Sequence, residues 1–325
     1  MRAIEYTEYG PPDVLRLVEV PKPAPKDDEV LIRIRAASIN ALDWRMVAGK
    51  PLFARLFTGG LRRPKVTRLG VDVSGEVEAI GASVTRFKPG DMVFGACRGS
   101  FAEYGCAREE KLAMKPAGVS FDDAAATPVA GLTALQALRD VAHIKGGQHV
   151  LVDGASGGVG TFAVQIARAS GADVTAVCST RNVETARSIG ADHVIDYTRE
   201  DFTRSGQRYD LILAANAYHS IFDYRRSLNP DGIYVIAGGG GAQMLQGMLL
   251  GPFLSVIGSK KMRFVMAKVT SSDLDILGEL VASGKLAPVI DRRYPLSDVA
   301  EAVRYVLDEH ARGKIVITVE HHGET

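Results

Sequence analysis

The sequence predicts an α/β protein in which a β-rich domain is interrupted by a doubly wound parallel sheet. Up to about residue 115, short apolar segments are separated by Gly and Pro at intervals of roughly 8–12 residues, which is typical of a small β-barrel or sandwich. From about residue 121 onward, short apolar segments alternate with helical ones. This alternation indicates parallel strands joined by crossover helices.

The length and composition agree with this interpretation. A chain of 325 residues is long enough for about two domains with a normal hydrophobic core. Hydrophobic residues make up 46% and charged residues 24%, close to the globular average, which argues against a disordered or fibrous protein. The 39 Lys and Arg nearly balance the 38 Asp and Glu. The net charge of +1 therefore gives no reason to expect nucleic acid or an acidic membrane surface as a partner.

The amino-terminal elements have the pattern of strands. Residues 30–35 alternate apolar and basic side chains, as a half-buried strand does. Residues 73–80 form a second extended segment. A Pro- and Gly-containing turn at 87–91 precedes a further strand at 92–94.

The rest of the chain predicts the parallel sheet and a return to the first domain. Strands are expected at 149–152, 173–177, 193–195, 210–213 and 233–236, with helices at 161–170 and 184–189. Helices at 274–282 and 299–307 precede a last strand at 314–319. We therefore expect one domain formed by residues 1–120 and 260–325, and a second formed by residues 121–259.

The cysteines and the apolar segments bear on the cellular setting. Cys97, Cys106 and Cys178 stand far apart, so neither a disulfide framework nor a four-Cys zinc site is expected, and a reduced cytoplasmic protein is favoured. Because charged residues come before any apolar stretch near the start, no signal peptide is expected. The most apolar window, residues 244–258, is too short to span a bilayer, so we expect a soluble protein without stable membrane insertion.

The most informative stretch is the turn between the strand at 149–152 and the next helix. Ala155, Gly157 and Gly160 have the spacing of a dinucleotide-binding turn. The first small residue permits the tight turn, the second lets a pyrophosphate approach, and the third lets the helix pack on the strand. Backbone N–H groups of this turn bind phosphates, so the predicted cofactor-binding residues here are Ala155, Ser156, Gly157, Gly158, Val159 and Gly160.

The same residues also match a hydrolase motif. Gly154, Ser156 and Gly158 have the G-x-S-x-G spacing of a nucleophile elbow, and Asp291 and His310 follow in the order that a serine hydrolase requires. The turn follows a long β-rich region instead of several βα units, and no HGG-type oxyanion segment is present. We favour dinucleotide binding over a hydrolase or a purely structural turn.

The residues after the second strand of the sheet favour NADPH. A dehydrogenase that prefers NAD usually places a carboxylate there to hold the ribose 2′-hydroxyl. Here the strand ends in Cys178-Ser179-Thr180-Arg181-Asn182, without a carboxylate. Ser179 can donate to a 2′-phosphate and Arg181 can neutralise it, although Arg181 can also be a solvated turn residue.

Taken with these features, several segments resemble a known family along the whole chain. The matching segments are 37–43, 69–75, 87–91, 155–160 and 313–316. The chain resembles the zinc-independent quinone oxidoreductase branch of the medium-chain dehydrogenase/reductase superfamily. The resemblance implies a GroES-like β-barrel catalytic domain and a Rossmann NADP-binding domain, with a homodimer formed through the edge of the Rossmann sheet.

The resemblance also implies that no zinc is bound. Zinc-dependent relatives have Cys where this chain has Asn40 and His where it has Val71, and the four-Cys lobe for structural zinc is missing after Arg98. Zinc needs about three protein ligands around an open position. Asp43 and Asp72 can bind a cation in principle, but we expect no metal.

The activity implied is an NADPH-dependent reduction of a quinone or an α,β-unsaturated carbonyl, because such an electrophilic small molecule accepts hydride without a Lewis acid. The candidate catalytic residues are Asn40, Asp43 and Trp44. Asn40 donates to the reacting oxygen or braces its own loop. Asp43 is expected to order the backbone, and Trp44 forms an apolar wall or packs in the core.

The resemblance assigns the remaining cofactor contacts to the ends of later strands. Tyr197 is expected near the adenosine phosphate, and Asn216, Gly238 and Gly239 near the nicotinamide ribose. The glycine run 238–241 can also be a flexible turn. A non-catalytic NADPH-binding or sensor protein remains the alternative from a different functional class.

One segment departs from the family. Every charged residue between Asp43 and Asp72 is basic, and these residues are Arg45, Lys50, Arg55, Arg62, Arg63, Lys65 and Arg68. Leu52, Phe53, Leu56 and Phe57 are interleaved with them, and Lys260, Lys261, Arg263 and Lys268 form a second basic run. The segment is either a solvated loop or a cationic lid over the substrate or against a membrane. No catalytic histidine is expected, and His321 and His322 are placed on a loose tail.

Overall fold

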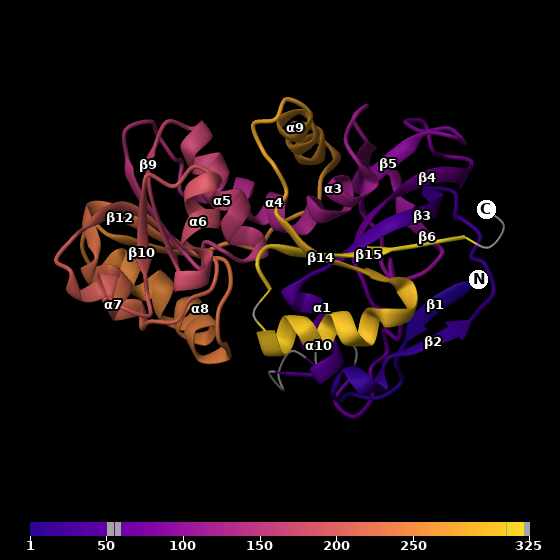
Figure 1. Cartoon of the computed structure of the whole chain (residues 1–325), viewed down its shortest axis with the longest axis horizontal. Coiled ribbons are helices and arrows are strands. Elements are labelled where there is room, and N and C mark those ends of the chain that lie inside the picture. The colour runs from indigo at the N-terminus through magenta and orange to yellow at the C-terminus, as the bar shows by residue number, and fades with distance from the viewer. Residues whose placement is uncertain (51–54, 56–59, 310, 322–325) are drawn as a thin grey trace. The chain divides into compact units, whose positions relative to one another are not determined.

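The computed structural model describes residues 1–50, 55, 60–309 and 311–321. Its contacts divide the chain into two compact units (Figure 1). Unit 1 comprises Met1–Val129, Val269–Gly284 and Ile290–Thr325, and unit 2 comprises Ala130–Lys268 and Lys285–Val289. The first two changes of unit, after Val129 and after Lys268, lie later in the chain than the sequence-based boundaries after residues 120 and 259, and residues Lys285–Val289 return briefly to unit 2.

Unit 1 is built on a mixed, mainly antiparallel sheet in the order β14-β15-β3-β4-β5-β7, with β6 paired to β3. The strands are β3 (Glu29–Ile39), β4 (Asp72–Ile80), β5 (Met92–Ala96), β6 (Tyr104–Arg108), β7 (Leu112–Met114), β14 (Ile290–Pro295) and β15 (Lys314–Thr318). A separate pair consists of β1 (Arg2–Glu5) and β2 (Arg16–Glu19). The long central β3 borders β4, β6 and β15, so its ends bring distant parts of the chain together.

The described helices of unit 1 lie around this sheet. They are α1 (Ala41–Ala48), α3 (Phe121–Ala126), α9 (Ser271–Ala282) and α10 (Val299–Glu309). The alternation at 30–35 is confirmed, since Val30, Ile32 and Ile34 are fully buried in the core of unit 1. Helix α1 was not expected. Asn40 is its N-cap, and the Asp43 carboxylate accepts the backbone N–H of Asn40 at 2.7 Å.

Unit 2 contains the predicted parallel sheet, in the order β10-β9-β8-β11-β12-β13. Its strands are β8 (His149–Asp153), β9 (Asp173–Cys178), β10 (His193–Asp196), β11 (Tyr209–Ala214), β12 (Leu228–Ile236) and β13 (Lys261–Phe264). Its helices are α5 (Gly158–Ala169), α6 (Val183–Ser188), α7 (Ile221–Arg226) and α8 (Gly241–Val256), and α4 (Pro128–Gln136) leads into this unit.

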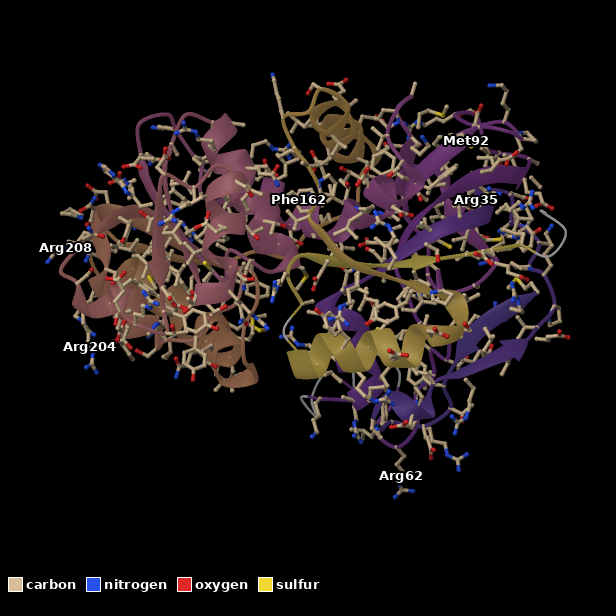
Figure 2. The ribbon with its side chains drawn as sticks, in the orientation of Figure 1. Arg35, Arg62, Met92, Phe162, Arg204 and Arg208 are labelled. Atoms are coloured by element: carbon tan, nitrogen blue, oxygen red, sulfur yellow. The ribbon has the colours of Figure 1, made fainter. Side chains whose placement is uncertain are left out.

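The connectivity of this sheet reverses between β8 and β11, because β9 and β10 lie on one side of β8 and β11 to β13 on the other. Parallel sheets bind their ligands at the carboxyl ends of the strands beside such a reversal. The glycine turn follows β8 directly, so the fold places it at this point. Helix α5 packs on β8 and β9, with Phe162 fully buried (Figure 2).

Several short helical segments connect the longer elements. One-turn 3-10 helices span Pro12–Val14, Glu109–Lys111, Thr180–Asn182, Phe202–Arg204 and Leu296–Asp298, and a π-helical segment spans Ala137–Val141. Arg62, Arg204 and Arg208 extend from the surface (Figure 2). In the described residues, no helix has both the length and the apolar character needed to cross a membrane.

The carboxyl-terminal tail differs from the expectation at His321. The His321 ring is buried, its Nε2 lies 2.8 Å from the carbonyl oxygen of Ile34, and it meets the Tyr104 ring edge-on at 5.2 Å. A loose tail was therefore wrong for this residue, because a hydrogen bond to β3 and an aromatic contact hold it. His322 lies outside the described residues.

Candidate functional site

The glycine turn of unit 2 gives two of its glycines different roles. Gly160 has no room for a side chain, because a Cβ there would lie 2.1 Å from the carbonyl oxygen of Gly154 and 2.7 Å from Cα of Ala155. A Cβ at Gly157 would meet only that same oxygen, at 3.6 Å. Gly160 thus lets α5 pack against the end of β8, whereas Gly157 keeps the outer side of the turn open. Ser156, Gly158 and Val159 are partly exposed around it.

The loop after β11 lies against this turn. The backbone N–H of Asn216 donates to the carbonyl oxygen of Asp153 at 3.3 Å. Gly154 has a φ of +79°, and a Cβ there would lie 2.7 Å from Cβ of Asn216. The two strand ends on either side of the connectivity reversal therefore meet at the predicted cofactor-binding residues.

The start of the glycine run is held by close backbone contacts. Gly239 has a φ of +144° and forms a parallel bridge with Ala217, whose N–H donates to the carbonyl oxygen of Gly238 at 2.9 Å. A Cβ at Gly238 would lie 2.4 Å from the carbonyl oxygen of Ala215. These two glycines are required by close backbone approach, which disfavours the interpretation as a flexible turn.

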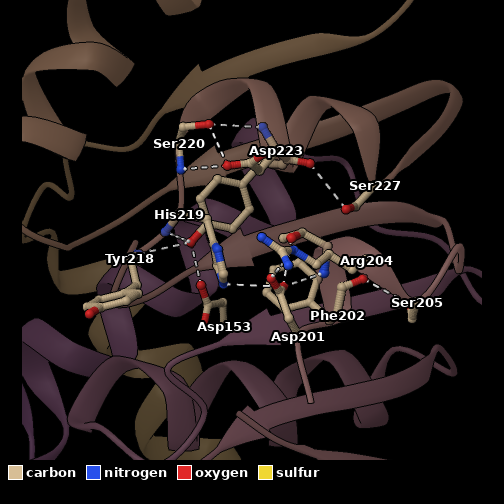
Figure 3. A network of polar contacts seen from close by, with 12 residues as sticks. Asp153, Asp201, Phe202, Arg204, Ser205, Tyr218, His219, Ser220, Asp223 and Ser227 are labelled. Carbon is tan, nitrogen blue, oxygen red and sulfur yellow. Dashed lines mark hydrogen bonds and ion pairs between the residues drawn. The ribbon is translucent and has the colours of Figure 1, made fainter. Parts of the chain in front are cut away.

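A buried hydrogen-bond network, which the sequence did not reveal, supports these strand ends (Figure 3). The Tyr224 hydroxyl donates to the buried carboxylate of Asp153, and it accepts the backbone N–H of Tyr218 at 3.1 Å. Burial raises the pKa of Asp153 to about 6, while the Tyr224 hydrogen bond opposes the rise. The network ties the residue before the glycine turn to the loop that carries Asn216.

The tip of β9 is linked to the glycine turn by one amide. The Nδ2 of Asn182 donates to Ser156 Oγ at 3.0 Å and to Ser179 Oγ at 3.1 Å. Its Oδ1 is buried and has no hydrogen-bond partner in the described part of the chain. The structure thus brings Ser156 and Ser179 together and leaves a buried polar atom between two predicted cofactor-binding segments. Sequence reasoning singled out the two serines and missed Asn182.

Arg181 and Tyr197 lie at the same end of the sheet. Both side chains are exposed, and the backbone N–H of Tyr197 donates to the carbonyl oxygen of Cys178 at 3.0 Å. A carboxylate that the sequence reasoning missed, Asp196, ends the neighbouring β10. It accepts from the Thr180 hydroxyl at 2.5 Å, and this bond is the largest of the effects that lower the pKa of Asp196. Asp196 therefore orders the tip beside Arg181.

Unit 1 places the predicted residue Asn40 in a buried polar cluster. Asn40 Nδ2 donates to Asp72 Oδ2 at 2.9 Å, and Ser38 Oγ donates to the same oxygen at 2.8 Å. The Lys314 ammonium donates to Asn40 Oδ1 at 2.6 Å and lies 3.2 Å from Asp72 Oδ2. Asp72 and Lys314 are buried, with side chains 0% and 2% exposed, whereas Asn40 is partly exposed.

The other two candidate catalytic residues, Asp43 and Trp44, follow Asn40 in the first turn of α1. Burial raises the pKa of Asp43 to about 7, against the hydrogen bond from the Asn40 backbone, and the nearby Asp72 carboxylate adds to the rise. Trp44 is partly buried and packs against the core of unit 1, with the Arg45 guanidinium 5.3 Å from its ring centroid. The geometry thus gives Asp43 a backbone partner at the start of α1, and Trp44 a core contact.

The hydrolase interpretation finds no support in the described contacts. Ser156 Oγ accepts from the Asn182 amide, which cannot act as a general base. Asp291 is engaged by the Tyr305 hydroxyl at 2.9 Å and by the backbone N–H of Arg312 at 2.8 Å. His310 lies outside the described residues.

The basic segment between Asp43 and Asp72 is only partly described, and Leu52, Phe53, Leu56 and Phe57 lie outside the described residues. Arg55 donates to the carbonyl oxygens of Gly49 and Leu61, at 2.8 and 3.1 Å. In unit 2, the ammonium groups of Lys260 and Lys261 donate to backbone carbonyls of the second halves of α7 and α8. These three basic side chains, and Arg68 through its ion pair with Glu5 at 3.2 Å, therefore have structural partners within their own units.

Comparisons with known proteins show the family to which the chain belongs. Residues 26–117 match the family model "Alcohol dehydrogenase GroES-like domain", and residues 189–317 match "Zinc-binding dehydrogenase". These two models and the fold define a medium-chain dehydrogenase/reductase.

Individual relatives indicate which branch of this superfamily the chain belongs to. The chain is 37% identical to the chloroplastic quinone-oxidoreductase QR1 of Triphysaria versicolor (98% of each chain), and 33% identical to the chloroplastic NADPH-dependent alkenal/one oxidoreductase of Arabidopsis thaliana (98% of this chain, 79% of the relative). Among solved structures, the quinone oxidoreductase of Coxiella burnetii aligns with a TM-score of 0.85 at 30% identity (98% and 99% covered). The Escherichia coli quinone oxidoreductase complexed with NADPH aligns with a TM-score of 0.82 at 25% identity (98% and 100% covered). The chain belongs to the quinone oxidoreductase branch of the medium-chain dehydrogenase/reductase superfamily.

The zinc that one family model names does not fit the residues around Asn40. A catalytic zinc needs about three nitrogen, sulfur or oxygen ligands with an open fourth position. Val71 has no ligand atom, Asn40 Oδ1 faces the Lys314 ammonium, and Asp72 is bonded to three donors through Oδ2. The described residues also contain no group of three His, Cys, Asp or Glu arranged to hold a metal ion.

Proposed function

We propose that the protein is an NADPH-dependent, zinc-independent oxidoreductase that reduces quinones or α,β-unsaturated carbonyl compounds. The observation that carries the proposal is the dinucleotide site at the connectivity reversal of unit 2, where Gly157 leaves the turn open and Asn182 joins Ser156 to Ser179. The relatives named as quinone and alkenal/one oxidoreductases supply the acceptor class.

The cofactor-binding residues have separate roles in this proposal. The backbone N–H groups in the first turn of α5, which begins at Gly158, bind the pyrophosphate. The N–H groups of Ala155 and Gly157 already donate to the carbonyl oxygens of Val177 and Gly154. Ser179 and Arg181 bind the 2′-phosphate, and Tyr197 lies near the adenosine. Asn216, Gly238 and Gly239 contact the nicotinamide ribose through the loop ends that close backbone contacts hold in place. When bound, NADPH supplies the hydride for the acceptor.

In unit 1, Asn40 donates a hydrogen bond to the acceptor oxygen on which negative charge develops. A hydrogen-bond donor fixed before the reaction stabilises such charge without reorganisation. Trp44 bounds the acceptor on one side with an apolar face, and Asp43 holds the start of α1 through the backbone of Asn40. No metal is assigned to this arrangement, because the donor set around Asn40 is already committed to Lys314 and Asp72.

Calorimetric titration with NADPH and NADH tests the cofactor assignment. We expect NADPH to bind at least tenfold more tightly, about 1.4 kcal/mol. Arg181→Ala should remove most of that preference by weakening NADPH alone. Arg208→Ala, which removes an exposed arginine of the same unit, is the matched control. Equal affinities in the native protein would contradict the NADPH assignment, and an undiminished preference in Arg181→Ala would exclude Arg181 as the phosphate-binding residue.

Steady-state assays with NADPH and a panel of quinones and enals test the reaction itself. Multiple turnovers with several acceptors support the enzyme. Cofactor binding without turnover of any acceptor would favour the NADPH-binding sensor instead.

A homodimer formed through unit 2 is also part of the proposal. Strand β13 is at the edge of the parallel sheet, and α8 packs beside it. Helix α8 exposes large apolar side chains, namely Leu245, Met248, Leu249, Phe253 and Val256. An exposed apolar surface of this kind on a soluble protein marks an interaction site. Light scattering should give twice 34.8 kDa for the native protein and a lower mass for Leu249→Glu combined with Phe253→Lys. Leu61→Lys, at an exposed site in unit 1, is the control.

We also propose a cytoplasmic location, supported by the three cysteines, which are free thiols in the structure. The chloroplastic location of the named relatives belongs to those proteins. Fractionation of the source cells, with the protein detected by antibody, tests this proposal, and recovery inside an organelle would contradict it.

A further inference from the structure

The ammonium group of Lys314 is buried in unit 1 and is not part of the proposed cofactor site. It donates to three oxygen atoms: the Ile39 carbonyl oxygen at 3.0 Å, Asn40 Oδ1 at 2.6 Å and Asp72 Oδ2 at 3.2 Å. These three bonds match the three donors of an ammonium group. Lys314 begins β15 and Asn40 follows β3, and these strands are antiparallel neighbours with Ile315 opposite Ile39. The sheet register therefore brings Lys314 to Asn40.

The surroundings fix which way the Asn40 amide is turned. An ammonium group can only donate, so it selects the Oδ1 side of the amide. An ionised carboxylate can only accept, so Asp72 selects the Nδ2 side. A 180° rotation of the amide would place Oδ1 against Asp72 and Nδ2 against Lys314, and both bonds would become repulsive. The two buried charges thus specify one orientation.

One N–H of Asn40 remains after these bonds. Nδ2 carries two hydrogens, and the described residues provide an acceptor for one of them, Asp72 Oδ2. Lys314 and Asp72 are buried, whereas Asn40 is partly exposed. The remaining N–H can therefore be offered to a ligand.

We propose that Lys314 and Asp72 are positioning residues for the reductase reaction, which fix the Asn40 amide so that its second N–H is held ready for the acceptor oxygen. This inference rests on the proposed function for its consequence in turnover. It goes beyond that function because it assigns the orientation of the Asn40 amide to the ion pair of Lys314 and Asp72, which lie 242 positions apart in the sequence.

The first test is on the native protein and is independent of turnover. The side-chain amide of Asn40 should give two NMR proton signals, assigned by their loss in Asn40→Ala. One, bonded to Asp72, should exchange slowly with solvent, and the other should exchange much faster. Similar fast exchange of both protons would overturn the proposal, because the amide would not be held.

The second test separates positioning from stability. Lys314→Met combined with Asp72→Asn removes both buried charges together, so neither is left unpaired. We expect this double variant to fold, to bind NADPH within twofold of the native affinity, and to lose about 100-fold in kcat, as expected for a misplaced transition-state donor. Adding Asn40→Ala should lower kcat little further, because the three residues act as a unit. Lys115→Met, which removes an ammonium bonded to carbonyl oxygens elsewhere in unit 1, should keep native kcat.

Native kcat in the folded double variant would overturn the proposal, as would a triple variant whose loss is the product of the separate losses. If the double variant does not fold, proton exchange in the native protein decides. A native protein that turns over no quinone or enal would remove the proposed function, while the exchange of the Asn40 amide would still decide whether Lys314 and Asp72 orient it.

Discussion

The two units build their candidate sites in different ways. In unit 2, the predicted cofactor-binding turn is made of consecutive residues at 154–160. Its geometry depends on glycines at positions where a Cβ would clash with the backbone. In unit 1, the polar cluster joins Ser38, Asn40, Asp72 and Lys314, and its geometry depends on charge. A turn of adjacent residues is defined by its local backbone, whereas a cluster of distant side chains exists only once the sheet has formed.

The same contrast separates the two buried carboxylates. Asp153 in unit 2 receives a hydrogen bond from a neutral Tyr224 hydroxyl, and burial raises its pKa to about 6. Asp72 in unit 1 lies 3.2 Å from an ammonium that is itself buried. A carboxylate bonded to a neutral hydroxyl can be replaced by an amide at small cost, because the hydroxyl keeps an acceptor. Removing one charge of a buried ion pair costs much more, because the other charge is left buried and unpaired.

The largest expected effect follows from this difference. Asp72→Asn leaves the Lys314 ammonium buried without its counter-charge and should reduce the free energy of unfolding by about 3–5 kcal/mol. Asp153→Asn keeps an acceptor for Tyr224 and should cost about 1 kcal/mol. Urea denaturation at pH 7 measures both. Glu184→Gln, in an exposed pair with Arg187, should cost at most about 1 kcal/mol. Equal losses in the two Asp variants would show that the ion pair is not decisive.

The second prediction concerns pH and Asp43. Its pKa of about 7 in the folded protein lies above the ordinary value near 4, so the folded form binds more protons than the unfolded form between these values. The contribution of Asp43 to the free energy of unfolding should therefore fall as the pH rises from about 4 to about 7. This fall is at most about 4 kcal/mol, at 1.36 kcal/mol per pKa unit.

Asp43→Asn should reduce this fall in the free energy of unfolding, measured by urea denaturation at pH 5 and pH 8. Asp153, with a pKa of about 6, contributes a fall of the same sign and is unchanged in that variant. An unaltered pH dependence in Asp43→Asn would show that Asp43 does not hold its proton in the folded state.

The smallest predicted effect separates two glycines of the cofactor turn. Gly160→Ala forces a Cβ to within 2.1 Å of a carbonyl oxygen and should destabilise the fold by about 1–3 kcal/mol. Gly157→Ala has room in the free protein, so its melting temperature should stay close to the native one. Its NADPH affinity should fall about tenfold, about 1.4 kcal/mol, because the methyl group occupies the open side of the turn. Native NADPH affinity in Gly157→Ala would place the pyrophosphate elsewhere.

The sequence by itself determined the parts of the protein that depend on neighbouring residues. Hydrophobic alternation located β3, and apolar segments between glycines located β8 to β11, because side-chain periodicity follows from local backbone geometry. The spacing of Ala155, Gly157 and Gly160 indicated the dinucleotide turn for the same reason, and the family resemblance supplied the branch.

The tertiary structure alone decided the contacts between distant residues. No local pattern shows that Lys314 reaches Asn40, that Tyr224 donates to Asp153, or that Asn182 joins Ser156 to Ser179. His321 likewise lies in a terminal segment that local reasoning treats as loose, yet β3 and Tyr104 hold it. Such contacts depend on strand register and on which side chains the folded chain shields from water. Neither property is encoded within one short segment, because each requires strands from distant parts of the sequence to be paired first.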